Sequence, residues 1–157
     1  MIEAAEGFEF LSTKTYGHSV GLSCAFRQWR AESHCHFLHG YALKIRFEFQ
    51  ATQTDVRNWV VDFGGMKSLK GTLEGFLDHK TIVARDDPHI EWFRQGDVLG
   101  TLELIELDHV GCEAMAQLIF EVASLWIIDA GYDDRVLLSL VEVAEHEGNS
   151  AIYRRTK

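Results

Sequence analysis

The chain has 157 residues, of which 46% are hydrophobic and 25% charged, so we expect one globular domain over residues 1–157. Its net charge of −9 argues against non-specific binding to nucleic acid or to an anionic membrane, because both would repel such a surface. The three cysteines have no CxxC spacing, which favours free thiols in a reducing compartment. Signal-peptide and membrane-spanning patterns are missing, so we expect a cytoplasmic protein.

The first part of the chain predicts β-structure. Residues 8–29 are rich in apolar and small side chains, with Gly17 and Gly21 as interruptions, and predict one long strand or two short ones. Residues 41–49 alternate almost perfectly between apolar and polar, which predicts a half-buried strand. A short apolar piece then ends at Asp62, which we expect to cap a helix.

The second part predicts two long helices and a hairpin. Apolar side chains recur at helical spacing from residue 66 to the Asp78-His79 pair, and again after Cys112. Residues 80–110 are the least regular, with a short helix at 89–95 and a short strand at 101–107. A hairpin is predicted over residues 136–154. The order predicts an α+β domain, a four-stranded antiparallel sheet with two helices packed on one face, whose open edges neighbouring subunits would close.

The loop at residues 33–41 concentrates groups that move protons or hold metals. Cys35 lies between His34 and His36, and a protonated imidazole would favour its thiolate, as suits a nucleophile or proton shuttle. The alternative is a small residue in a turn. With His39 the loop has the composition of a metal site, but its spacing matches no metal motif.

Two further positions carry candidate chemistry. In the Asp78-His79 pair the carboxylate can fix the imidazole tautomer for acid–base work, although adjacent side chains need not touch. Glu145 ends an apolar strand, where its carboxylate would need hydrogen-bond donors such as the two adjacent N–H groups of an aminopyrimidinone edge. A solvated hairpin glutamate is the alternative.

These residues resemble motifs of the 6-pyruvoyl-tetrahydropterin synthase and 6-carboxytetrahydropterin synthase family, which has the tunnelling fold. Residues 35–40 resemble its Cys-x-x-Leu-His-Gly-His element, whose cysteine is catalytic. The Leu77-Asp78-His79 sequence resembles the element with its catalytic aspartate and histidine. Cys112 and Glu113 resemble a Ser-Glu or Thr-Glu pair near the pterin, and Glu145 the glutamate that grips the pterin ring.

The resemblance implies a lyase acting on 7,8-dihydroneopterin triphosphate or a close relative, in a pterin or 7-deazaguanine (queuosine) pathway. Cys35 would be the general base, with His79, oriented by Asp78, as its partner. It also implies a homo-trimer or hexamer, with sheets joined into a barrel and each site built from two chains. Arg27 and Arg30 would meet the phosphate tail or be solvated.

The family's zinc is held by three histidines, and the resemblance places His39 at one of these positions. Phe26 and Tyr41 stand at the other two. Three alternatives follow. His34 or His36 restores a metal site, the chain is a metal-independent pterin side-chain aldolase, or it is a non-catalytic pterin- or purine-binding module.

Overall fold

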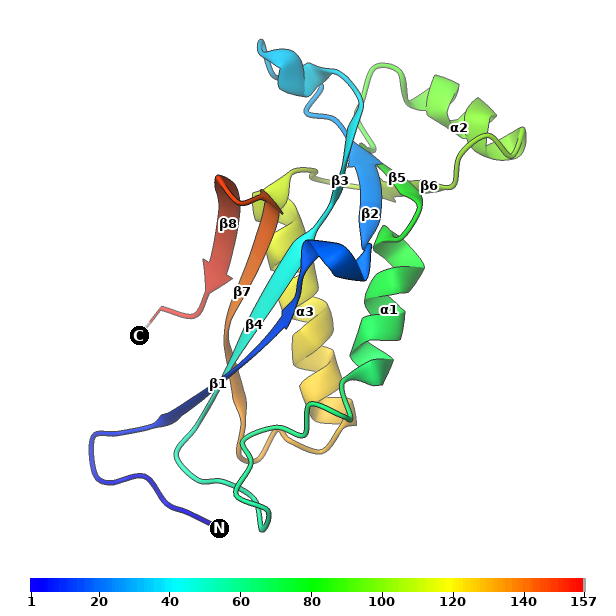
Figure 1. The fold of residues 1–157 in the computed structure, drawn as a ribbon. Helices are drawn as coiled ribbons and strands as arrows, with labels where there is room; N and C mark the ends of the chain where they lie inside the picture. The colour runs from blue at the N-terminus through cyan, green and yellow to red at the C-terminus, as the bar shows by residue number, and fades with distance from the viewer. Residues whose placement is uncertain (157) are drawn as a thin grey trace.

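The computed structural model describes residues 1–156, which form two β-sheets with helices alongside them (Figure 1). The first sheet is antiparallel, in the order β1-β4-β7-β8. Its strands are β1 (Phe10–Tyr16), β4 (Lys44–Ala51), β7 (Leu137–His146) and β8 (Asn149–Arg154). The second sheet has the order β3-β2-β5-β6. Its strands are β3 (His39–Ala42), β2 (Ser23–Phe26), β5 (Lys80–Ala84) and β6 (Leu104–Leu107).

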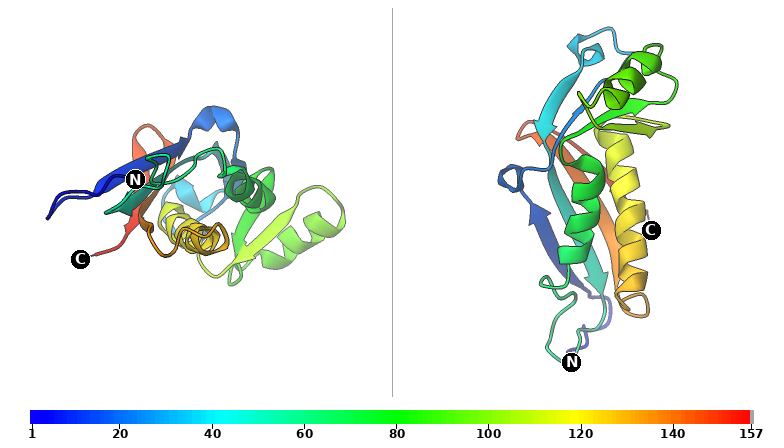
Figure 2. Two further views of the ribbon diagram at one scale, coloured as in Figure 1. Left: turned by 90° about the horizontal axis from the view of Figure 1, so that it is seen from below. Right: turned by 90° about the vertical axis from the view of Figure 1, so that its right-hand side faces the viewer.

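The helices α1 (Lys67–Leu77) and α3 (Cys112–Asp129) lie side by side over one face of the first sheet (Figure 2). The core lies between these layers, where the apolar face of β4 is completely buried. The α+β prediction, with two helices on one face of an antiparallel sheet, is therefore confirmed. No helix in residues 1–156 is long and apolar enough to cross a membrane.

The strand predicted at residues 41–49 is divided between the two sheets. The chain leaves β3 after Ala42 and enters β4 at Lys44, and the N–H of Leu43 between them donates to the Leu22 carbonyl. Residues 8–29 likewise form two strands, separated by the 3-10 helix η1 (His18–Val20) and by Gly21 in a left-handed conformation. The strand predicted from the apolar alternation is present, but the alternation does not indicate which sheet each part of it joins.

The second sheet was not predicted. Strand β5 pairs in parallel with both β2 and β6, and residues 81–84 of it are all buried, so its sequence shows no alternation. The helix α2 (Ile90–Val98) connects β5 to β6, which accounts for most of residues 80–110. A parallel pair needs such a crossover connection.

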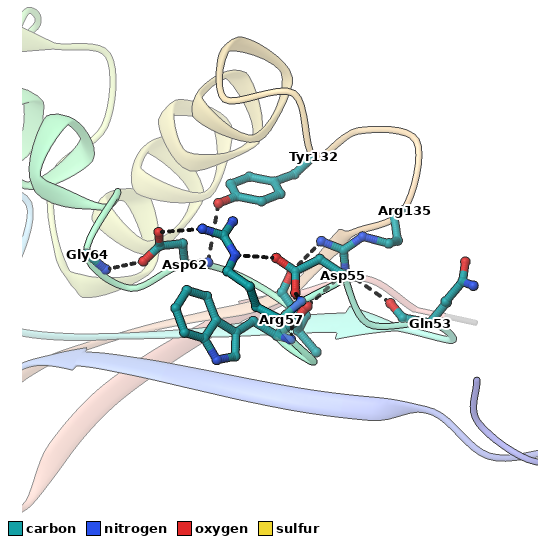
Figure 3. A network of polar contacts seen from close by, with 9 residues as sticks. Gln53, Asp55, Arg57, Asp62, Gly64, Tyr132 and Arg135 are labelled. Carbon is teal, nitrogen blue, oxygen red and sulfur yellow. Dashed lines mark hydrogen bonds and ion pairs between the residues drawn. The ribbon is translucent and has the colours of Figure 1, made fainter. Parts of the chain in front are cut away.

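Asp62 does not cap a helix. Its carboxylate accepts from the N–H of Gly64 at 2.8 Å within a turn, and α1 begins three residues later without a side-chain cap. The loop before α1 is held instead by Arg135, whose guanidinium donates to the carbonyls of Gln53 at 3.0 Å and Val60 at 2.8 Å (Figure 3). This network is structural, because it ties the loop before α1 to the turn that precedes β7.

Candidate functional site

Five of the candidate residues line one pocket of about 390 Å³, which we call the Cys35 pocket. They are Cys35, His39, Cys112, Glu113 and Glu145. They come from the loop before β3, from β3 itself, from the start of α3 and from the end of β7. Phe26 and Gln28 line the same pocket. The fold therefore assembles side chains that are up to 110 residues apart, counted from Cys35 to Glu145.

A bulge aims Glu145 into this pocket. The β7–β8 register pairs Ala144 with Ser150 and His146 with Asn149, so Glu145 is skipped. An extra residue in one strand bends that strand and redirects its side chain. The Glu145 carboxylate lies close to the Cys112 thiol, and burial together with this carboxylate raises the pKa of Cys112 to about 12. A carboxylate accepts about four hydrogen bonds, so most of its capacity remains available to a ligand.

The start of α3 depends on a glycine that the sequence did not single out. Gly111 precedes the helix with φ of 118°, a conformation that other residues rarely adopt. A side chain there would also lie 2.8 Å from Gln28 Nε2, which donates to the Val110 carbonyl. Gly111 and Gln28 thus set the approach of Cys112 and Glu113 to the pocket. A glycine before a predicted helix is the signal that could have identified this position.

Cys35 lies in the 3-10 helix η2 (His34–His36) with its side chain exposed. The loop is fixed by its backbone, since the Cys35 carbonyl accepts from the N–H of Gln28 at 2.9 Å. The Arg27 guanidinium donates to the His36 carbonyl at 3.3 Å. Residues 27 and 28, which directly follow β2, therefore hold the Cys35 loop at the pocket.

Arg27 is itself anchored by Asp87, in the turn after β5. Two hydrogen bonds, of 2.7 and 2.8 Å, join the guanidinium to this carboxylate, whose side chain is fully buried. The next residue back, Asp86, pairs with Arg30 at the surface. Both arginines considered for a phosphate tail are therefore already neutralised by aspartates. Their role in this structure is to attach the Cys35 loop to residues 85–89.

The Asp78 and His79 side chains lie close together without a hydrogen bond between them, and neither lines the Cys35 pocket. Asp78 Oδ1 lies 2.8 Å from His79 Nδ1, and the imidazole is 85% exposed. His79 has φ of 59°, and its N–H donates to the Ser23 carbonyl at 2.6 Å. A non-glycine residue in this conformation is uncommon and is a reason to consider function. The imidazole opens on a separate surface pocket that Tyr41 also lines, which we call the His79 pocket.

The three positions that the resemblance assigns to zinc ligands converge. Strands β2 and β3 pair Phe26 with His39 and Cys24 with Tyr41, which places the three rings on one face. The ring centroid of His39 lies 5.4 Å from that of Phe26 and 5.4 Å from that of Tyr41. The centroids of Phe26 and Tyr41 are 6.2 Å apart. We call these residues the aromatic triad.

The sequence model of the family described as 6-pyruvoyl tetrahydropterin synthase matches residues 18–156. The chain belongs to this family. Curated protein sequences include no match to it. Among solved structures, an uncharacterized protein from Wolinella succinogenes has a TM-score of 0.76 at 18% identity, over 95% of this chain and 98% of that one.

Two synthases of the family have similar folds. The 6-pyruvoyl tetrahydropterin synthase of Plasmodium falciparum has a TM-score of 0.65 at 16% identity, over 94% of this chain and 98% of that one. The 6-pyruvoyl tetrahydropterin synthase of Caenorhabditis elegans has a TM-score of 0.59 at 15% identity, over 99% of this chain and 100% of that one. At these identities the likeness concerns the fold, and the tunnelling-fold prediction is confirmed for the single chain.

The aromatic triad does not fit the zinc ion that the family resemblance implies. Protein ligands of zinc are cysteine, histidine, aspartate and glutamate, and the triad contains one of these. Within residues 1–156, no group of three or more such side chains is placed to hold a metal. The alternative in which His34 or His36 restores the site finds no support, because neither joins His39 in such a group.

Proposed function

We propose that this chain is a pterin-pathway lyase that acts on the side chain of 7,8-dihydroneopterin triphosphate or a close relative. The observation that carries this proposal is that Cys35 and Glu145 line one pocket. The Glu145 carboxylate suits recognition of a polar ring edge, and the Cys35 thiol suits proton transfer. Membership of the synthase family supports the choice of a pterin.

Glu145 is the proposed ring anchor. The 2-amino group and the neighbouring ring N–H of a pterin are two parallel donors, which a carboxylate accepts in a bidentate manner. The bulge turns Glu145 out of the sheet ladder, so its oxygens can meet such an edge. Cys112 and Glu113, at the start of α3, border the same pocket and would contact the bound ring.

Cys35 is the proposed proton acceptor. Its thiol is exposed on a loop that the backbone of Gln28 and the side chain of Arg27 fix in place. A general base must lie within hydrogen-bond reach of the proton that it removes. With the ring held by Glu145, the substituent at ring carbon 6 would lie toward Cys35 and His39, which line the same pocket.

His79, oriented by Asp78, would act in the pocket of a neighbouring copy. Its exposure and its left-handed backbone suit a residue presented to a partner. The first sheet also ends in β1 and β8, and these edge strands expose Leu11 and Ile152, each at 53%. Open edges with apolar side chains favour pairing between chains. A trimer or hexamer, with the sheets closed into a barrel, would follow.

A metal-independent aldolase is the second candidate, and the aromatic triad favours it. Proton abstraction beside a hydroxyl normally gains several kcal/mol from a metal acting as a Lewis acid. Phe26 and Tyr41 offer no donor set for such an ion. A retro-aldol cleavage breaks the bond between the first two side-chain carbons, and an enzyme can assist it with acid–base groups alone.

The products separate these candidates. We would incubate the protein with 7,8-dihydroneopterin triphosphate and identify the products by mass spectrometry. Elimination releases inorganic triphosphate, whereas retro-aldol cleavage leaves a 6-hydroxymethyl pterin. Cys35→Ala should abolish either reaction and leave ring affinity unchanged, and Cys24→Ala, which removes a buried thiol, is the control. An unchanged substrate that still binds would contradict the lyase and identify a non-catalytic binding module.

A further inference from the structure

His39 lines the Cys35 pocket, and Tyr41, which lines the His79 pocket, packs against His39. Their rings are nearly perpendicular, at 85°, with centroids 5.4 Å apart. His39 Nδ1 lies 2.7 Å from the Phe37 carbonyl, which can only accept, so this nitrogen carries a proton. In the neutral ring Nε2 is then a free acceptor. The Tyr41 hydroxyl is able to donate.

The surroundings of Tyr41 keep its hydroxyl protonated. Burial raises the pKa of Tyr41, and electrostatic interaction with the nearby Glu145, Cys35 and Cys112 raises it further. At neutral pH the phenol is therefore a hydrogen-bond donor. The same three residues line the Cys35 pocket, so the phenol lies in the electrostatic field of the groups assigned to bind and react.

Phe26 is the third member of the aromatic triad and contributes an apolar ring. It is 2% exposed and packs on both His39 and Tyr41, at centroid distances of 5.4 and 6.2 Å. The place of a three-ligand centre is thus occupied by a packed ring, one hydrogen-bond donor and one acceptor. A fixed donor and acceptor match an alcohol oxygen, which accepts one hydrogen bond and donates another.

We propose that Tyr41 and His39 bind a side-chain hydroxyl of the substrate at the position where family members place a metal, with Tyr41 donating to its oxygen and His39 Nε2 accepting its proton. This rests on the proposed function, because the pterin ring must first be anchored by Glu145. Donors aimed at a reacting oxygen in a desolvated pocket stabilise developing charge. The ligand class is a 6-substituted pterin with a hydroxyl on its first or second side-chain carbon.

The first test is a comparison of two ligands in the absence of turnover. 7,8-Dihydroneopterin has the side-chain hydroxyls, and 6-methyl-7,8-dihydropterin lacks them. With chelator present, the wild type should prefer the hydroxylated ligand roughly tenfold, the scale of one or two hydrogen bonds. Tyr41→Phe keeps the ring and should abolish most of this preference, whereas the control Tyr153→Phe, on β8, should retain it. Equal binding of the two pterins by the wild type, or an unchanged preference in Tyr41→Phe, would overturn the proposal.

The same titrations separate this proposal from the function on which it rests. If neither pterin binds, the proposed function is wrong and the role of Tyr41 falls with it. If both bind equally and Glu145→Gln weakens both, ring recognition stands and only the Tyr41–His39 assignment is wrong.

The second test restores the metal ligands. Phe26→His combined with Tyr41→His would rebuild three histidines, and this variant should take up about one equivalent of zinc or cobalt. Adding His39→Ala should remove that uptake. The wild type, incubated with zinc and desalted, should retain far less than one equivalent. A wild type that retains about one equivalent, lost in His39→Ala, would show that a metal occupies this place and would overturn the proposal.

Discussion

The Cys112 thiol, at the start of α3, lies close to the Glu145 carboxylate, at the bulge in β7, and both residues line the Cys35 pocket. Burial and the nearby carboxylate raise the pKa of this thiol to about 12, which keeps it protonated at neutral pH. Cys35 faces the same pocket with an exposed side chain. The pocket therefore contains two cysteines in different environments, of which only Cys35 is available as a base.

The two pocket thiols should differ in reactivity. With a pKa of about 12, roughly one Cys112 in 10⁴ is ionised at pH 8, and only the thiolate reacts with alkylating reagents. Iodoacetamide at pH 8 should therefore modify Cys35 at least a hundredfold faster than Cys112, as peptide mass spectrometry would measure. Glu145→Gln should accelerate the alkylation of Cys112, because the substitution removes the negative charge beside the Cys112 thiol. Equal rates in the wild type would contradict this environment for Cys112.

Stability should fall at alkaline pH because of Cys24. Burial raises the pKa of this thiol to about 12 in the folded state, while the unfolded value remains near 9. The folded state thus binds the proton more tightly, and the stabilisation present below pH 9 is lost as pH rises toward 12. Between pH 8 and 10 the wild type should lose about 1–2 kcal/mol more unfolding free energy than Cys24→Ala, by denaturant titration. Parallel losses in both proteins would refute the buried thiol as the cause.

Adjacent aspartates in the β5–α2 turn should differ in their effect. Asp87→Asn leaves Arg27, 16% exposed, without its charged partner and should cost about 3 kcal/mol of stability. Asp86→Asn breaks an exposed pair with Arg30 and should cost less than about 1 kcal/mol.

Hydrogen exchange would show whether the Cys35 loop responds to this pair. Because Arg27 also donates to the His36 carbonyl, Asp87→Asn should increase exchange in residues 34–37. Asp86→Asn should leave that exchange unchanged. Similar exchange in both variants would mean that Asp87 does not position the Cys35 loop.

The alternation of apolar and polar residues predicted the half-buried strand β4 correctly. The alternation of Ile45, Phe47 and Phe49 places them in the core, where all three are fully buried. The parallel strand β5 could not be predicted in this way, because Ile82 and Val83 are covered on both faces and show no period.

The candidate site residues were identified mainly from the order of short sequence motifs along the chain, and less from hydrophobic periodicity. The pocket contains Cys35, Glu113 and Glu145 as the motifs indicated, but the bulge that turns Glu145 depends on the register of two strands. Gln28 and Gly111 were missed because their roles are long-range contacts, formed only once β2 and α3 meet. The place of His79 in a complete site stays a prediction, since it involves a second copy.

Binding of 7,8-dihydropterin to Glu145→Gln tests the central claim most directly. We expect the variant to bind the ring at least tenfold more weakly than the wild type, because an amide cannot accept both ring N–H bonds as a carboxylate does. Glu147→Gln, which changes an 82% exposed carboxylate in the adjacent turn, is the matched control and should bind like the wild type. Fluorescence titration would measure all three dissociation constants. Unchanged affinity in Glu145→Gln, or equal losses in both variants, would contradict a pterin anchored by Glu145.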